Sequence, residues 1–178
     1  MIRKKTVKEL LGESLEELLK SKPFEKISVQ EIAENCGVGR RTFYNNFTDK
    51  NDLATWLYMR QLNAFIESRD SAKLSDFIRY STEVVSKDLQ IIIALDKYKG
   101  QNNLRDSLAE PMTDAYIDVI GKYFGLEVNE EMKQDIEFYV GGQIAYVARI
   151  IHGTKIPTSG EVTDYFIRCI PESLKRFI

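Results

Sequence analysis

Apolar residues recur along this chain at spacings of three and four, the period of an amphipathic helix, and strand-like alternation is scarce. The first such run is leucine-rich, from Leu10 to Leu19, and ends before Pro23, because proline disfavours helix at the residue before it. Ser28 and Glu31 have the spacing of a capping box and predict the start of a second, short helix that stops at Gly37. We therefore expect an all-α fold of about nine helices.

Further helices follow from the same pattern and from the glycine and proline residues that interrupt it. A short helix is expected from Gly39 to Phe47, and a longer one, preceded by Thr48 and Asp49, from Lys50 to about Ser68. The remaining helices are predicted near residues 73–86, 88–99, 103–123, 130–152 and 161–176. The division is expected at residue 60, giving a three-helix domain over 1–60 and a helical bundle over 61–178.

Two short helices joined by a glycine-containing turn, here over residues 29–48, are typical of a helix-turn-helix. Ala33 is small where the second helix must come close, and Gly37 tolerates the positive φ of the turn. Ile32, Val38 and Phe43 are expected to form the internal core. This arrangement leaves the polar side chains of the second helix on its outer face.

The outward side chains have the chemistry of a DNA interface. Arginine binds guanine or phosphate in bidentate fashion, asparagine pairs with adenine, and hydroxyl groups suit phosphate oxygens. Each also has a plainer interpretation, such as a surface ion pair for the arginines or a partly buried core position for Tyr44. The candidate DNA-binding residues are Gln30, Arg40, Arg41, Thr42, Tyr44, Asn45, Asn46 and Lys50.

The motif resembles the TetR family of bacterial transcription regulators. The resemblance is carried over residues 6–57 by Ile32-Ala33, Gly37-Val38, Thr42-Phe43-Tyr44, Phe47, Lys50 and Leu53. It implies a homodimeric repressor of a palindromic operator on double-stranded DNA, controlled by an effector at the C-terminal domain. A regulator or activator controlled by a partner protein is the alternative. A cytoplasmic location is expected because no signal peptide is evident. Gly39 and Arg41 depart from the family pattern, so the base preference is expected to differ from that of better-known members.

Composition limits the other functions. The single histidine and two distant cysteines do not suit a metal site or a disulfide framework, so we expect no metal and no cofactor. No nucleophile–base pair or phosphate loop is evident, which makes a helical enzyme, or an adaptor that binds only protein, the weaker hypotheses. No apolar run reaches the length of a membrane span, and no signal peptide is expected. Residues 1–60 carry eleven Lys/Arg against nine Asp/Glu, and residues 61–178 carry fourteen against eighteen, which places an anionic partner at the N-terminal end.

Two roles are expected of the C-terminal region. Aromatic and polar side chains between its helices suggest an effector pocket, although a filled core would use the same residues. The candidate pocket residues are Tyr98, Tyr116, Gln143 and Tyr146. Apolar stripes on the last two helices, with Gly141 and Gly142 mid-helix, predict a four-helix dimer interface, unless they only close the subunit's own core. The candidate interface residues are Ile136, Val140, Ile144, Val147, Ile151, Phe166 and Ile170.

Overall fold

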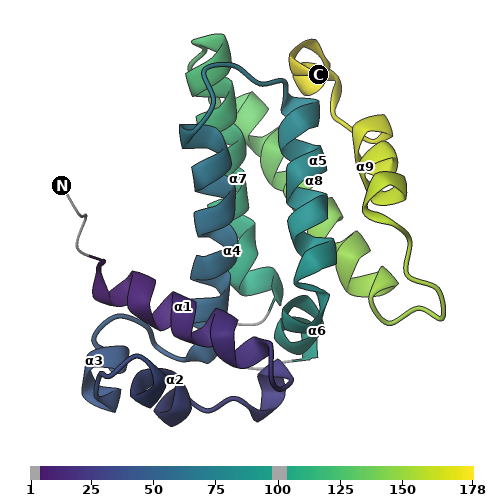
Figure 1. The fold of residues 1–178 in the computed structure, drawn as a ribbon. Coiled ribbons are helices and arrows are strands. Elements are labelled where there is room, and N and C mark those ends of the chain that lie inside the picture. Colours follow the sequence, from purple (N-terminus) through teal and green to yellow (C-terminus); the bar gives the residue numbers. More distant parts are fainter. Residues whose placement is uncertain (1–4, 98–103) are drawn as a thin grey trace. The chain divides into compact units, whose positions relative to one another are not determined.

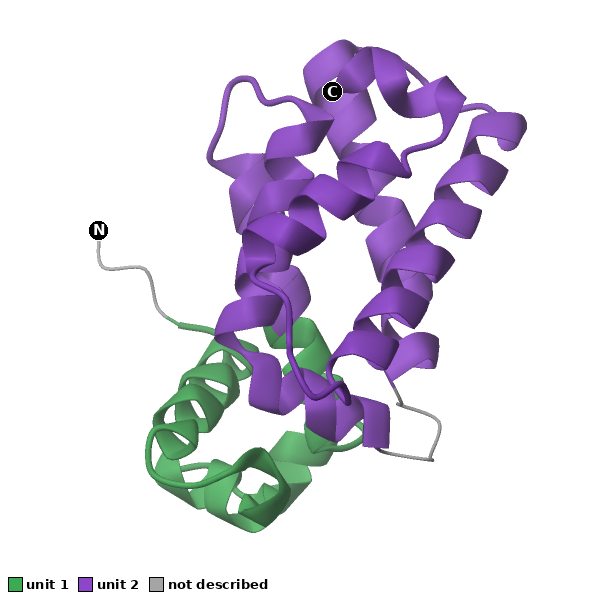
Figure 2. Cartoon of the chain, turned by 90° about the vertical axis from the view of Figure 1, so that its right-hand side faces the viewer, with its two compact units in different colours: residues 1–57 green, residues 58–178 purple. Residues whose placement is uncertain are grey.

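The computed structural model describes residues 5–97 and 104–178, and within these ranges all regular secondary structure is helical (Figure 1). The all-α prediction is confirmed. The chain divides into two units, residues 1–57 and 58–178 (Figure 2). The α-helices are α1 (Val7–Leu19), α2 (Val29–Asn35), α3 (Arg40–Tyr44), α4 (Lys50–Glu67), α5 (Leu74–Lys87), α6 (Leu89–Lys97), α7 (Leu104–Phe124), α8 (Glu130–Ile150) and α9 (Ser159–Arg168), and the 3-10 helices are η1 (Phe24–Lys26) and η2 (Glu172–Phe177).

Local capping sets where the helices of the first unit begin. The predicted capping box of Ser28 and Glu31 opens α2, and an equivalent box of Thr6 and Glu9 opens α1. The Asp49 carboxylate accepts hydrogen bonds from the backbone amides of Asn51 and Asp52, so the first turn of α4 is capped as expected. These caps fix the register in which each helix presents its apolar face.

The first unit is closed by a small apolar core to which every one of its helices contributes. Its fully buried side chains include Leu11, Leu15, Phe24, Ile32 and Phe43. The buried Ser14 hydroxyl of α1 donates to the Ile32 carbonyl of α2 over 2.7 Å and ties the two helices together. Such a hydrogen bond between buried groups avoids the cost of an unpaired hydroxyl.

The second unit contains the C-terminal part of α4, α5–α9 and η2. In it α7 packs against α8, and α5 packs against α9. Three buried polar contacts join these helices: Thr82 with Thr163 at 2.6 Å, Tyr116 with Gln143 at 3.0 Å, and the Tyr139 hydroxyl with the Phe166 carbonyl at 2.6 Å. Satisfied polar groups of this kind help to select one packing among the similar apolar ones.

Two predicted helix boundaries are wrong. The helix expected over 161–176 ends at Arg168 and is followed by the separate η2, because Pro171 cannot continue an α-helix. The helix expected from Gly39 to Phe47 is regular only as far as Tyr44. The other long helices begin and end within a few residues of their predicted limits.

Candidate nucleic-acid interface and effector cavity

The turn between α2 and α3 sets the direction of α3. Gly37 has a φ of 73°, which side chains with a Cβ rarely adopt, and this explains the glycine. The amide of Val38 then donates to the Ala33 carbonyl over 2.9 Å, which closes the turn directly behind α2. Of the predicted internal core, Ile32 and Phe43 are buried, together with Ala33, whereas Val38 is only half-buried.

The outer face of α3 carries an exposed set of polar side chains. Arg40, Arg41 and Asn45 are exposed, and Tyr44 has 57% of its surface accessible. Within the described residues neither arginine forms an ion pair. Because Phe43 anchors α3 from below, these four side chains share one rigid surface, which we call the α3 face. Its charge and hydrogen-bonding groups match those that read DNA.

Two of the predicted contact side chains, those of Gln30 and Asn46, form hydrogen bonds within the unit. The Gln30 amide donates to the Glu34 carboxylate on the same exposed side of α2. The Asn46 amide donates to the Thr42 carbonyl over 2.8 Å, which caps the end of α3, and both residues are half-buried. The α3 face therefore rests on Arg40, Arg41, Tyr44 and Asn45, while the roles of Gln30, Thr42 and Asn46 in DNA binding stay predictions.

Lys50 does not belong to the α3 face. Its ammonium donates to the carbonyls of Phe24 at 2.9 Å, Glu25 at 3.0 Å and Ile27 at 2.8 Å. A lysine has three N–H donors, and all of them are used here. Partial burial lowers its pKa. In this structure Lys50 clamps η1 to the start of α4, and a phosphate contact would require it to leave three carbonyls.

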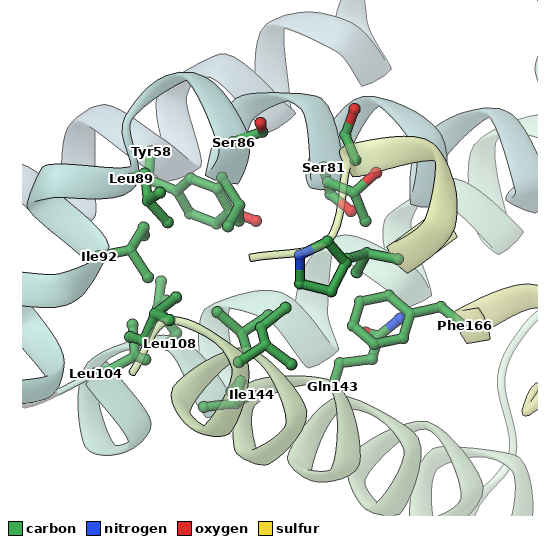
Figure 3. Close-up of a pocket in the computed structure, with 18 of the residues that line it drawn as sticks. Tyr58, Ser81, Ser86, Leu89, Ile92, Leu104, Leu108, Gln143, Ile144 and Phe166 are labelled. Atoms are coloured by element: carbon green, nitrogen blue, oxygen red, sulfur yellow. The ribbon is translucent and has the colours of Figure 1, made fainter. Parts of the chain in front are cut away.

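The second unit contains an apolar cavity of about 70 Å³ between its helices (Figure 3). Of the predicted pocket residues, Gln143 lines this cavity. Tyr116 lies behind it, fully buried, with its hydroxyl on Gln143. Tyr146 is instead stacked on Tyr165 at a ring distance of 4.5 Å, and Tyr98 lies outside the described residues.

Sequence reasoning missed several residues of this cavity. Tyr58, Ser81 and Thr82 line it, although each belongs to a helix whose apolar stripe is predictable. Nothing in a helical period distinguishes a stripe that fills a core from one that borders a cavity. The one available signal is a polar residue within an apolar stripe, and Gln143 is such a residue.

The apolar stripe that was predicted to form the dimer interface faces the core of its own subunit instead. Its members, which lie on α8 and α9 or directly after them, are buried within one chain. Each is at most 8% exposed: Ile136, Val140, Ile144, Val147, Ile151, Phe166 and Ile170. They pack against the other helices of the same unit and are not available to a second subunit. The opposite side of α8 carries Phe138, which is 85% exposed, and Gly142 and Ala145, which are also exposed.

Two negative findings apply to the described residues. In this part of the chain, no group of three or more His, Cys, Asp or Glu side chains is placed to hold a metal ion. None of the helices that the structure describes combines the length and the apolar character that crossing a membrane would require.

The fold and the α3 face define a helix-turn-helix DNA-binding domain followed by a helical domain. Residues 13–55 match the family model described as bacterial regulatory proteins, tetR family. Several HTH-type transcriptional regulators of Staphylococcus aureus are 30% identical over 105 residues, which cover 53% of this chain and 57% of the first of them. The match thus spans little more than half the length of these relatives. Over residues 13–55 the chain thus has the DNA-binding region that the tetR family model describes.

Solved structures share the fold over nearly the whole chain. Thermus thermophilus FadR, a TetR family repressor in complex with lauroyl-CoA, has a TM-score of 0.69 at 15% identity and covers 92% of each chain. The dihydroxyacetone kinase operon activator DhaS has a TM-score of 0.60 at 12% identity and covers 96% of this chain and 97% of its own. At these identities the likeness concerns the fold alone.

Proposed function

We propose that this protein is a DNA-binding transcriptional regulator that reads its operator with the α3 face. The observation that carries the proposal is the exposure of Arg40, Arg41, Tyr44 and Asn45 above the buried Phe43. Arginine and asparagine supply base-edge contacts, and the tyrosine hydroxyl supplies a phosphate contact. The fold is shared by a protein described as a repressor and by one described as an activator, so a reporter assay has to decide the sign of regulation.

Selection of bound sequences from a random duplex library tests this proposal. The wild-type chain should enrich one motif, and Arg41→Ala should lose preference at defined positions at a cost of about 1–3 kcal/mol per good base contact. Arg79→Ala, which removes an exposed arginine from α5 in the second unit, is the charge-matched control and should leave the motif unchanged. Failure of the wild-type chain to enrich any sequence would refute specific binding.

We further propose that the regulator is a homodimer through the outer side of α8. One helix-turn-helix domain covers only a few base pairs, so specific operators normally present two half-sites about 34–36 Å apart. The exposed Phe138 is the largest apolar side chain on this side, and a Cβ added to Gly142 would meet nothing within 4 Å in the single chain. A small residue beside an exposed aromatic ring suits close packing of a second helix.

Sedimentation velocity tests the dimer. Wild-type protein should sediment near twice the chain mass of 20.6 kDa. Phe138→Glu should give monomers, because it places a charge at the centre of the proposed contact. Arg79→Glu on α5 is the control and should remain dimeric. A wild-type monomer at micromolar concentration that still bound its operator tightly would contradict this arrangement.

The proposed signal is an effector bound in the cavity of the second unit. Its wall is mainly apolar with a few polar groups, the usual make-up of a ligand site. FadR, a structural neighbour, was solved with lauroyl-CoA, which supports a ligand-binding role for the equivalent domain here. One helix, α4, begins in the first unit and continues into the second, where its Tyr58 borders the cavity. A ligand that contacts α4 therefore contacts a helix that begins in the helix-turn-helix domain.

A further inference from the structure

The outer side of α8 carries four exposed positions in a straight row along the helix. They are separated by seven, four and seven residues: Glu131, Phe138, Gly142 and Arg149. Seven residues are close to two helical turns and four are close to one, so the four positions share one narrow face. We call them the outer row of α8. Its spacing is the same when it is read from either end.

The two charges at the ends of the outer row have no ion-pair partner within the described part of the subunit. Neither Glu131 nor Arg149 takes part in a salt bridge there. The Arg149 guanidinium is held 5.1 Å from the centre of the Tyr146 ring, and that ring stacks on Tyr165. The contact orients the cation without neutralising it, because the ring has no net charge. One exposed anion and one exposed cation are therefore left at opposite ends of the row.

A row with the same spacing in both directions suits two antiparallel helices related by a two-fold axis. An axis at the level of Val140 brings Phe138 of each copy opposite Gly142 of the other. The same axis brings Glu131 of each copy opposite Arg149 of the other. The first pair joins a large ring to an open space, since a Cβ added to Gly142 would meet nothing within 4 Å in the single chain, and the second joins opposite charges. Shape and charge thus indicate the same register.

Other arrangements of the two helices lose these contacts. A parallel pair would bring Glu131 against Glu131 and Arg149 against Arg149, and like charges repel. An antiparallel pair shifted by one turn would move Phe138 away from Gly142 and would also separate the opposite charges. The row is about 27 Å long, and helices that cross at about 20° stay within reach of long side chains over that length.

We propose that two copies of this chain pair through antiparallel α8 helices in the register set by the outer row. Phe138 of each copy fills the space beside Gly142 of the other, and an ion pair of Glu131 with Arg149 lies on either side of this contact. The proposal rests on the homodimer proposed above and specifies its contacts. It also makes the surface selective for a second copy, because a related helix that lacks one of the two charges leaves the other unpaired.

Charge reversal tests this register on the full chain. Because the two-fold axis repeats every substitution, Glu131→Arg turns both ion pairs into repulsive pairs, and Arg149→Glu does the same. Exposed ion pairs each contribute little, so the dissociation constant of the dimer should rise about 10–30-fold for either variant at low salt. The rise should shrink at about 1 M salt, where exposed charges are screened. Sedimentation equilibrium over a range of protein concentrations measures the constant.

A mixture of the two variants is the decisive measurement. In a heterodimer, the substituted position 131 of one chain faces the substituted position 149 of the other, and the native Arg149 faces the native Glu131. Both pairs then join opposite charges again. An equimolar mixture with one chain fluorescently labelled should form heterodimers with a dissociation constant within about threefold of the wild-type value. The double variant Glu131→Arg, Arg149→Glu should likewise restore the homodimer, which a misfolded chain would not do.

Glu130→Arg is the matched control. Glu130 is exposed and lies in the same first turn of α8, so its reversal changes the net charge and the interaction with the helix dipole in the same way. It lies about 100° around the helix from Glu131 and is outside the outer row. The dissociation constant of this variant should stay within about twofold of the wild-type value.

The outcomes separate the register from the dimer itself. A wild-type monomer would refute both. A wild-type dimer that is unaffected by the reversals would refute the register and leave the homodimer standing. The same holds if the mixture and the double variant stay dissociated. An effect of Glu130→Arg as large as that of Glu131→Arg would show a general response to charge and would also overturn the register.

Discussion

Replacement of Lys50 by methionine should lower the stability of the first unit, and it should not remove a phosphate contact. The ammonium holds three carbonyls of residues 24–27 against the first turn of α4. Methionine keeps most of the apolar stem but donates no hydrogen bond. The carbonyls of Phe24 and Ile27 are bonded in a partly buried setting, whereas the Glu25 carbonyl is exposed and can take up water.

The size of the effect follows from these settings. A hydrogen bond from a charged donor contributes roughly 1.5–3 kcal/mol. The two bonds to the partly buried carbonyls of Phe24 and Ile27 account for most of the expected loss of stability. Removal of the ammonium also removes the cost of desolvating it, which offsets part of the loss, since burial already lowers its pKa in the folded chain. We expect the free energy of unfolding of the first unit to fall by about 2–3 kcal/mol.

Urea denaturation followed by tryptophan fluorescence measures this loss. Trp56 is the single tryptophan and lies in the first unit, so its emission reports on that unit. Lys26→Met, at an exposed lysine of η1, is the control and should leave the midpoint unchanged. The reasoning is refuted if Lys50→Met leaves the midpoint in place and instead reduces the salt slope of DNA binding by about 0.9, the value expected for a single phosphate contact.

Three further changes test the packing of other positions. The pKa of Glu31 is held at about 2, against an ordinary 4.5, mainly by a hydrogen bond from the Lys22 ammonium and also by hydrogen bonds from the amide and hydroxyl of Ser28. The stability that the Glu31 carboxylate contributes is therefore present above pH 4.5 and is lost as pH falls towards 2. Glu31→Gln should flatten the acid limb of a Trp56 fluorescence titration between these values. Gly12→Ala should destabilise the first unit, because the new Cβ would lie 2.9 Å from the Leu57 side chain and 3.0 Å from that of Trp56, and an unchanged melting temperature would contradict that packing. Gly142→Ala should stabilise the Phe138→Glu monomer by about 1 kcal/mol through helix propensity and weaken dimerisation in the wild-type background; equal stabilisation in both would argue against an interface on that side of α8.

Much of the fold follows from local sequence signals. The capping box of Ser28 and Glu31, the glycine turn at Gly37 and the apolar period are read directly from neighbouring residues, and the structure has each of them. The break at Pro171 does not show in the apolar stripe, which continues past the proline while the α-helix does not. Periodicity records which face is apolar, but the backbone can break without disturbing it.

The site is only partly predictable because side-chain direction depends on tertiary contacts. Lys50 has the composition of a DNA-contacting lysine, and only the positions of three distant carbonyls turn it inward. The stripe from Ile136 to Ile151 is equally apolar whether it faces its own unit or a second subunit, and the structure buries it in its own unit. Phe138, the exposed exception, is hidden among the apolar residues around it until burial is known.

The most direct test of the account is the salt dependence of binding to the duplex selected from the random library. For the wild-type chain, the logarithm of the binding constant should fall steeply and linearly with the logarithm of salt concentration, because phosphate contacts release counterions. The triple variant Arg40→Ala, Arg41→Ala, Tyr44→Phe should bind weakly, and its slope should be shallower by about 0.9 for each phosphate that these side chains neutralise. A triple variant with wild-type affinity and slope would contradict the central claim that the α3 face is the DNA-binding surface.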